Sequence, residues 1–110
     1  GEPAGTVLVS AEAGSEEAST WVVVTARVCE GRVAGLDARV FGCPHTRAAC
    51  DRAVQLLTGA PIAELGRLEP RSLGADLGIP PEKAGRLLII QDALRNCLAD
   101  WDNGELKPAP

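Results

Sequence analysis

Cysteine is the most reactive residue type in this chain, and Cys43 has the best position for chemistry. The pattern predicts a strand that ends at Phe41 and a helix that begins at Pro44, because proline suits the first position of a helix. A residue before proline is kept out of the helical conformation, so Cys43 is the expected N-cap. The free N–H groups of the first helical turn would then stabilise its thiolate. The alternative is an ordinary half-buried cysteine at a turn.

The other three cysteines lack the tight CxxC spacing of metal and redox motifs. Cys50 follows Cys43 by two helical turns, or about 10 Å, whereas metal–sulfur bonds are about 2.3 Å long. One metal ion therefore cannot bind both, and we expect Cys50 to pack in the core. Cys97 falls on an apolar helical face and is also expected in the core. Cys29 lies at the end of a hairpin without an evident partner.

His45, the only histidine, is expected at the second position of the helix. Its imidazole could lower the pKa of the Cys43 thiol or bind a metal, and the alternative is a solvent-facing side chain. One Cys and one His are too few for zinc, which takes three or four protein ligands. Carboxylates from Glu12, Glu16 or Glu17 could complete such a site. Hydrolase and phosphate-binding motifs are absent, since the chain has no GxSxG, no second histidine and no phosphate-cradling glycine loop.

The composition indicates one globular domain. The chain has 110 residues, 45% hydrophobic content and a net charge of −4, without a Lys/Arg cluster, so neither nucleic acid nor an anionic membrane is an expected partner. No apolar run is long enough to cross a bilayer. The cysteine spacing favours a cytoplasmic protein with free thiols, and a secreted domain with two disulfides is the alternative.

The first part of the chain predicts strands. Residues 21–28 are rich in β-branched side chains, and residues 32–41 return as a second strand after a turn at Glu30 and Gly31. Residues 6–9 are a short strand candidate. Residues 10–20 are small, acidic and aperiodic, so we expect an exposed loop there.

The second part predicts helices at residues 47–58, 62–65 and 72–77, followed by a long helix opened by Pro80 and Pro81. Its apolar face comprises Leu87, Ile90, Leu94, Leu98 and Trp101. Strands followed by helices predict an α+β fold, with a three-stranded antiparallel sheet, helices packed on one face and a long C-terminal helix. We expect a single domain over residues 1–110, with a core at 5–101 and a loose tail at 102–110.

Several stretches together carry a family resemblance. Residues 5–14 match a first-loop pattern close to GxxLVGxPxCGD, and residues 31–43 match a strand that leads into an FGCG or YGCG turn. Residues 79–83 are similar to an LPPVK stretch, and residues 91–101 continue like an EDAI…ADY helix. In this order and spacing the chain resembles the NifU/IscU family of iron–sulfur cluster scaffolds, which implies a SufE/NifU-like fold.

The departures from this family concern the cluster ligands. Family scaffolds hold a [2Fe–2S] cluster with three cysteines and a contribution from a nearby His or Asp. By resemblance the first-loop cysteine falls at Gly14 or is lost in the acidic insertion, and an adjacent His and Cys fall at Gly85 and Arg86, so only Cys43 is kept. A cluster needs about four ligands, so one chain should not hold it in the usual way, even with His45. Arg86 near Cys43 would favour a thiolate and disfavour a metal cation.

The resemblance also implies a function and partners. It implies handling of iron or an iron–sulfur cluster, a cysteine desulfurase as partner and no enzymatic activity. An Hsp70-type chaperone would bind at Ile79, Pro80, Pro81 and Lys83, where Glu82 replaces the family's valine. Three alternatives stay open: a sulfur acceptor with one persulfide-forming cysteine, as in the SufE family, an interaction module that kept only the fold, and a zinc protein.

Overall fold

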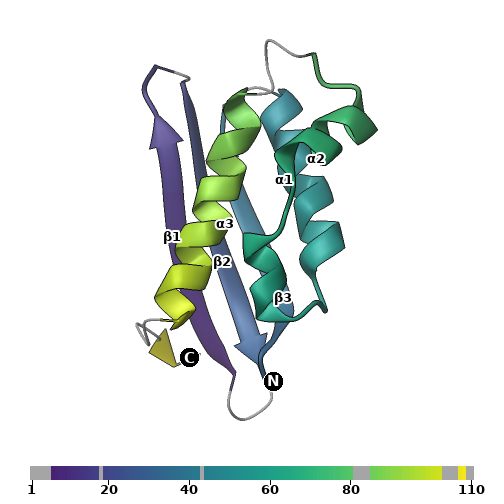
Figure 1. The fold of residues 1–110 in the computed structure, drawn as a ribbon. Coiled ribbons are helices and arrows are strands. Elements are labelled where there is room, and N and C mark those ends of the chain that lie inside the picture. Colours follow the sequence, from purple (N-terminus) through teal and green to yellow (C-terminus); the bar gives the residue numbers. More distant parts are fainter. Residues whose placement is uncertain (1–5, 18, 43, 81–84, 103–106, 109–110) are drawn as a thin grey trace.

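The computed structural model describes residues 6–17, 19–42, 44–80, 85–102 and 107–108. Within these residues, a layer of helices covers one face of an antiparallel sheet (Figure 1). The elements in chain order are β1 (Val7–Ser15), β2 (Thr20–Cys29), β3 (Arg32–Phe41), α1 (Pro44–Leu57), the 3-10 helix η1 (Ile62–Gly66), α2 (Pro70–Leu77), α3 (Leu87–Asp102) and β4 (Lys107–Pro108). This confirms the predicted α+β fold, with three main strands followed by helices. No helix in the described part of the chain combines the length and apolarity needed to cross a membrane.

The sheet has the order β3-β2-β1-β4, and each neighbouring pair is antiparallel. Strict alternation in β2 explains why only one face is covered, because Val22, Val24, Ala26 and Val28 are buried and the residues between them face outward. The β2–β3 turn is formed by Glu30 and Gly31, as predicted. Their φ angles of 53° and 75° are those of a two-residue turn with both central residues in the left-handed region.

The prediction of an exposed loop over residues 10–20 is wrong for most of its length. Strand β1 continues to Ser15, and the turn to β2 occupies only the residues that follow. The inward positions of this extension are Ala11 and Ala13, which are partly buried against the core. Alanine has a low strand propensity, so the local pattern does not indicate a strand. Pairing with β2 and packing under α3 decide the conformation instead.

Most of the predicted helices are confirmed. Helix α1 begins at Pro44, and α2 ends before Gly78, which has a left-handed φ of 65°. The last helix differs from the expectation, because α3 begins at Leu87 rather than at Pro80 and Pro81. Residues 85–86 form a 3-10 turn before it, while residues 81–84 lie outside the described part. Within the expected loose tail, Lys107–Pro108 pair with the start of β1.

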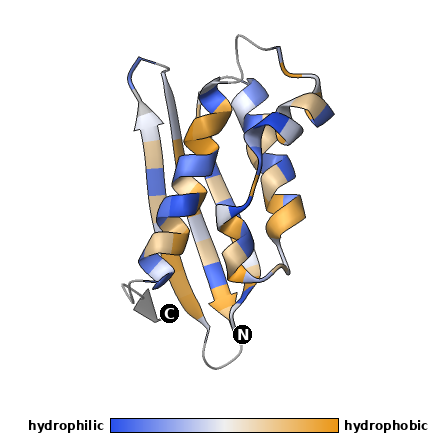
Figure 2. Ribbon diagram, in the orientation of Figure 1, coloured by the Kyte–Doolittle hydropathy of each residue, from blue (hydrophilic) through white to orange (hydrophobic). Residues whose placement is uncertain are grey.

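The core lies between the sheet and the helices. Helix α3 packs on β1 and β2, while α1 packs chiefly on β3. The predicted apolar face of α3 is confirmed, since Leu87, Ile90 and Leu94 are buried and its two other members are partly buried. Figure 2 shows apolar and polar residues alternating along the strands and helices. This arrangement leaves the opposite face of the sheet uncovered by helices.

Candidate functional site at the strand-to-helix corner

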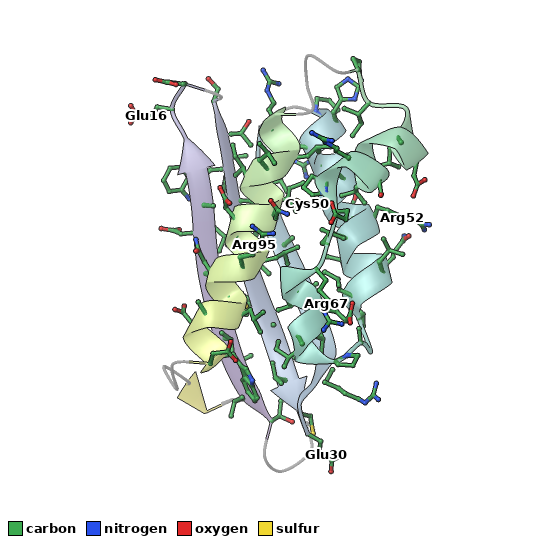
Figure 3. All side chains as sticks on the ribbon, in the orientation of Figure 1. Glu16, Glu30, Cys50, Arg52, Arg67 and Arg95 are labelled. Atoms are coloured by element: carbon green, nitrogen blue, oxygen red, sulfur yellow. The ribbon has the colours of Figure 1, made fainter. Side chains whose placement is uncertain are left out.

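Three separate parts of the chain meet at one end of the molecule: the β1–β2 turn, the junction of β3 with α1 and the start of α3 (Figure 1). In Figure 3, Glu16 marks this end, and Glu30 lies at the opposite end. The β3–α1 junction is close to β2, because a Cβ built on Gly42 would be 3.3 Å from the hydroxyl oxygen of Thr20. The fold therefore gathers Gly14, Gly42 and Gly85, the flanks of the predicted site. Cys43 itself lies outside the described residues.

Helix α1 supplies the electrostatics of this corner. It begins at Pro44, directly after Cys43 in the chain, and its first turn contains no acidic residue. The partial positive charge of the helix N-terminus is therefore not offset by a carboxylate from that turn. The guanidinium of Arg47 donates to the carbonyl of Val40 at 3.5 Å, which ties the first turn of α1 to β3. A thiolate beside this turn would be stabilised.

His45 has an exposed side chain in the first turn of α1, which agrees with the alternative of a solvent-facing residue. Within the described residues, no three His, Cys, Asp or Glu side chains come together as a metal site. Of the carboxylates considered for zinc, Glu12 accepts a hydrogen bond from the indole N–H of Trp21 at 3.3 Å. A zinc site at Cys43 and His45 stays a prediction.

Gly14 is covered by an aromatic ring. It pairs with Trp21 across β1 and β2, and a Cβ at position 14 would overlap the Trp21 indole. Stacking of an aromatic side chain over a cross-strand glycine is a known way to fill the space that glycine leaves. A ligand side chain therefore cannot occupy this position unless Trp21 moves. Sequence reasoning missed Trp21, because its place over Gly14 depends on the register between β1 and β2, and residues 10–20 gave no strand signal.

Gly85 and Arg86 lie in the 3-10 turn that precedes α3. Gly85 is exposed, and no described residue lies within 4 Å of a Cβ built on it. It lines a hollow of about 330 Å³ between α2 and the start of α3, with Arg71, Ile79 and Leu88 among its other lining residues. Arg86 is half-buried and forms no hydrogen bond or ion pair with another described residue. Its predicted effect on Cys43 stays a prediction.

The predicted chaperone-binding stretch is described only in part. Ile79 and Pro80 are half-buried, and Ile79 lines the hollow beside Gly85. Pro81 and Lys83 lie outside the described residues. The segment that follows α2 lies at the same end of the molecule as the strand-to-helix corner (Figure 1).

The other three cysteines are free thiols, so the alternative with two disulfides does not hold. The core positions of Cys50 and Cys97 are confirmed, with exposed fractions of 2% and 0%. Figure 3 shows Cys50 between α1 and α3. Burial, and secondarily Asp51, raises the pKa of the Cys50 thiol to about 12.

Burial also raises the pKa of Cys97 to about 11, with a further increase from Asp100 and a partial offset from the Ala26 backbone. The Cys97 thiol donates to the carbonyl of Val9 at 3.6 Å. Both buried thiols are therefore protonated and shielded at neutral pH. Cys29 is half-exposed but lies at the opposite end of β2 from the corner. These positions leave Cys43 as the candidate reactive thiol of this end.

An exposed aromatic pair lies beside the corner. Trp21 and Phe41 are directly opposite each other on β2 and β3, and 40% and 61% of their surfaces are exposed. With Glu16, Ser19 and Thr20 they line a shallow hollow of about 180 Å³. Exposed aromatic side chains in a hollow are common in protein interfaces. The hollow joins the β1–β2 turn to the end of β3.

The fold and the corner thus define an α+β domain with one candidate thiol, and comparison with known proteins finds sequence relatives. The chain is 28% identical over 71 residues to the "Iron-sulfur cluster assembly enzyme IscU" of Drosophila melanogaster, covering 64% of this chain and 46% of the relative. It is 25% identical over 65 residues to "Iron sulfur cluster assembly protein 1, mitochondrial" of Yarrowia lipolytica, covering 59% of this chain and 36% of the relative. No protein-family model matches.

The chain spans less than half the length of either of these relatives. At 28% and 25% identity, the chain is distantly similar to IscU-type iron–sulfur cluster assembly proteins, in agreement with the resemblance of its motifs.

Proposed function

We propose that this protein takes part in iron–sulfur cluster assembly as an IscU-like protein, with Cys43 as its reactive thiolate. The observation that carries the proposal is the similarity to IscU-type assembly proteins over about two thirds of the chain. The gathering of the β1–β2 turn, the β3–α1 junction and the start of α3 at one end supports it. The cluster, or its sulfur, is cargo in this proposal, and the protein itself catalyses no reaction.

Among the possible roles of Cys43, acceptance of sulfur is the one that the corner favours over holding a complete cluster. The Trp21 ring covers Gly14, one of the positions at which the family resemblance implies a ligand, and at another such position Arg86 would place a cation. Cys43 and His45 leave one chain with at most two ligands, whereas a cluster needs about four. To act as a full scaffold, the protein would need to form a dimer, which doubles the number of ligands.

The proposed transfer is a thiol–disulfide exchange. The Cys43 thiolate attacks the terminal sulfur of a persulfide carried by a cysteine desulfurase. The sulfur–sulfur bond of the desulfurase breaks, its cysteine leaves as a thiolate, and a new sulfur–sulfur bond forms on Cys43. The electrons balance without another oxidant or reductant. The N-terminus of α1, free of acidic residues in its first turn, would stabilise both the attacking thiolate and the product persulfide.

Intact-mass spectrometry tests this role directly. The protein is incubated without oxygen with a purified cysteine desulfurase and cysteine, and one added sulfur should raise its mass by about 32 Da. Cys43→Ser should abolish the gain. Cys29→Ser is the matched control, because Cys29 is the half-exposed thiol at the other end of β2, and this variant should behave as wild type. Absence of the adduct on the wild-type protein would refute sulfur acceptance.

The same variants separate the other candidate functions. If Cys43→Ser keeps partner binding and cellular function, the domain is an interaction module. If wild-type protein reconstituted with iron and sulfide without oxygen shows cluster absorption, it is a scaffold. If protein purified without chelators contains stoichiometric zinc that Cys43→Ser loses, it is a zinc protein.

We further propose a cytoplasmic location, and an Hsp70-type chaperone as a second partner at residues 79–83.

A further inference from the structure

The outer edge of β3 is a second candidate binding surface, independent of the cysteine corner. The strand order places β3 at one end of the sheet. An edge strand presents backbone N–H and C=O groups that can pair with an added strand, and many peptide-binding domains use such an edge. Helix α1 packs on this same edge strand.

The first half of this edge is already paired within the chain. The N–H of Val33 donates to the carbonyl of Ala60 at 2.8 Å, and the N–H of Gly59 donates to the carbonyl of Val33 at 2.7 Å. Arg32 and Pro61 continue this as an antiparallel bridge. The segment after α1 therefore acts as a short added strand. Its bonds show that the N–H and C=O groups of Val33 point away from β2.

A β-bulge determines which backbone groups face outward farther along β3. The register shifts by one residue beside Arg27 and Val28, so the alternation that starts at Val33 continues with Leu36, Ala38 and Val40. The bond from Arg47 to the Val40 carbonyl agrees with this assignment. Among the described residues, no backbone group pairs with the outward N–H and C=O of Leu36 and Ala38. This part of the edge is open.

Open space borders this part of the edge on both faces of the sheet. A hollow of about 410 Å³ on the helix side is lined by Leu36, Asp37, Ala38, Asp51, Val54 and Gln55. A hollow of about 550 Å³ on the uncovered face is lined by Val23, Thr25, Asp37, Ala38 and Arg39. The edge and α1 therefore form a slot in which one extended chain could lie beside β3.

The geometry of α1 argues against antiparallel pairing of a second copy of the whole domain at this edge, because both α1 helices would then lie on the same face. Paired strands lie about 4.8 Å apart, whereas packed helices need about 8–10 Å between their axes. Since α1 packs chiefly on the edge strand itself, the α1 of a second copy paired at this edge would overlap the first. A bare extended segment carries no such helix and fits. The side chains indicate its character, because Leu36 and Val54 are apolar on the helix side, whereas Asp37 is acidic on the uncovered face.

We propose that the edge of β3 from Leu36 to Val40 binds an extended peptide with alternating basic and apolar residues, as an added strand beneath α1. The backbone of the peptide pairs with Leu36 and Ala38. Its apolar side chains lie on the helix side and contact Val54, and its Lys or Arg side chains, which alternate to the other face, approach Asp37.

A fluorescein-labelled Lys-Val-Lys-Val-Lys peptide, with blocked ends, is the probe. The expected result is saturable binding in fluorescence anisotropy, at least tenfold weaker for a Glu-Val-Glu-Val-Glu peptide and for Asp37→Lys. Ala38→Pro should also weaken binding at least tenfold, because proline removes an outward N–H without removing a bond to β2. Ala38→Val keeps the N–H and adds similar bulk, so it should bind as wild type.

Amide exchange followed by NMR on the wild-type protein gives a second measurement that does not depend on the folding of a variant. Bound peptide should slow exchange at Leu36 and Ala38, while Asp37, whose N–H faces β2, should change little. Absence of binding, equal binding by Ala38→Pro with an unchanged circular dichroism spectrum, or slowed exchange only around Trp21 and Phe41 would each overturn the proposal. So would a dimer whose formation protects the β3 edge.

Discussion

Alkaline pH should destabilise this protein through its two buried thiols. Burial, helped by Asp51, raises the pKa of Cys50 from 9.0 to about 12, and burial with Asp100 raises that of Cys97 to about 11. In the unfolded chain both thiols ionise near pH 9, whereas the folded protein keeps them protonated. A pKa raised on folding means that stability is complete below the unfolded pKa and falls as the pH rises. The loss should begin near pH 9, and continue to about pH 11 for Cys97 and pH 12 for Cys50.

The expected magnitude is large compared with the stability of a small domain. Between pH 8 and pH 10, each thiol that ionises only on unfolding lowers the free energy of unfolding by about 1.4 kcal/mol. Both together lower it by about 3 kcal/mol, against a typical total of about 5–15 kcal/mol. Few other groups titrate in this range, because the chain has no tyrosine and its lysines are Lys83 and Lys107.

Urea unfolding at pH 8 and pH 10, in the presence of a phosphine reductant and followed by tryptophan fluorescence, measures this loss. The Cys50→Ala/Cys97→Ala variant should be less stable than wild type at pH 8. Its free energy of unfolding should, however, change much less between pH 8 and pH 10 than that of the wild type. Cys29→Ala is the control and should keep it, because this thiol is half-exposed. The reasoning is refuted if the wild-type free energy of unfolding is the same at both pH values. It also fails if the double variant shows the full wild-type loss.

Three further predictions follow from positions described above. Gly14→Val should lower the free energy of unfolding, measured in urea, by about 1–3 kcal/mol because the valine side chain collides with Trp21. Adding Trp21→Ala should recover part of this loss, and full additivity of the two changes would contradict the contact. Gly31→Ala should cost about 1 kcal/mol because φ is 75° there, and an unchanged thermal midpoint would argue against this turn. A thiol reagent at pH 8 should label the half-exposed Cys29 rapidly and the two buried thiols only after denaturation; rapid labelling of Cys50 or Cys97 would contradict their described burial.

Local sequence signals predicted the elements whose residues strongly favour one conformation. The β-branched run of β2, the Glu30–Gly31 turn and Pro44 at the start of α1 each restrict the backbone locally, and each was confirmed. The second half of β1 was missed because its small and acidic residues favour no strand by themselves. Its conformation depends on hydrogen bonds to β2 and on packing under α3, both of which involve residues distant in the sequence.

The candidate site divides in the same way. Sequence spacing indicated Cys43 as the thiol of interest and placed Cys50 and Cys97 in the core, because helical periodicity separates buried from exposed positions. The Trp21 ring over Gly14 could not be predicted from either residue alone, since it depends on the register between two strands. The exposed pair of Trp21 and Phe41 depends on the same register across β2 and β3.

The sequence by itself therefore determined the order of strands and helices, the turn residues and the start of α1 beside Cys43, because these depend on backbone preferences over a few residues. Only the tertiary structure decided that the β1–β2 turn, the β3–α1 junction and the start of α3 share one end of the molecule (Figure 1), and that no described backbone group pairs with the β3 edge at Leu36 and Ala38. Strand register, the bulge beside Arg27 and the position of α1 over the edge strand arise from contacts between distant segments. Such contacts are selected by the packing of the whole core and leave no local signal in the chain.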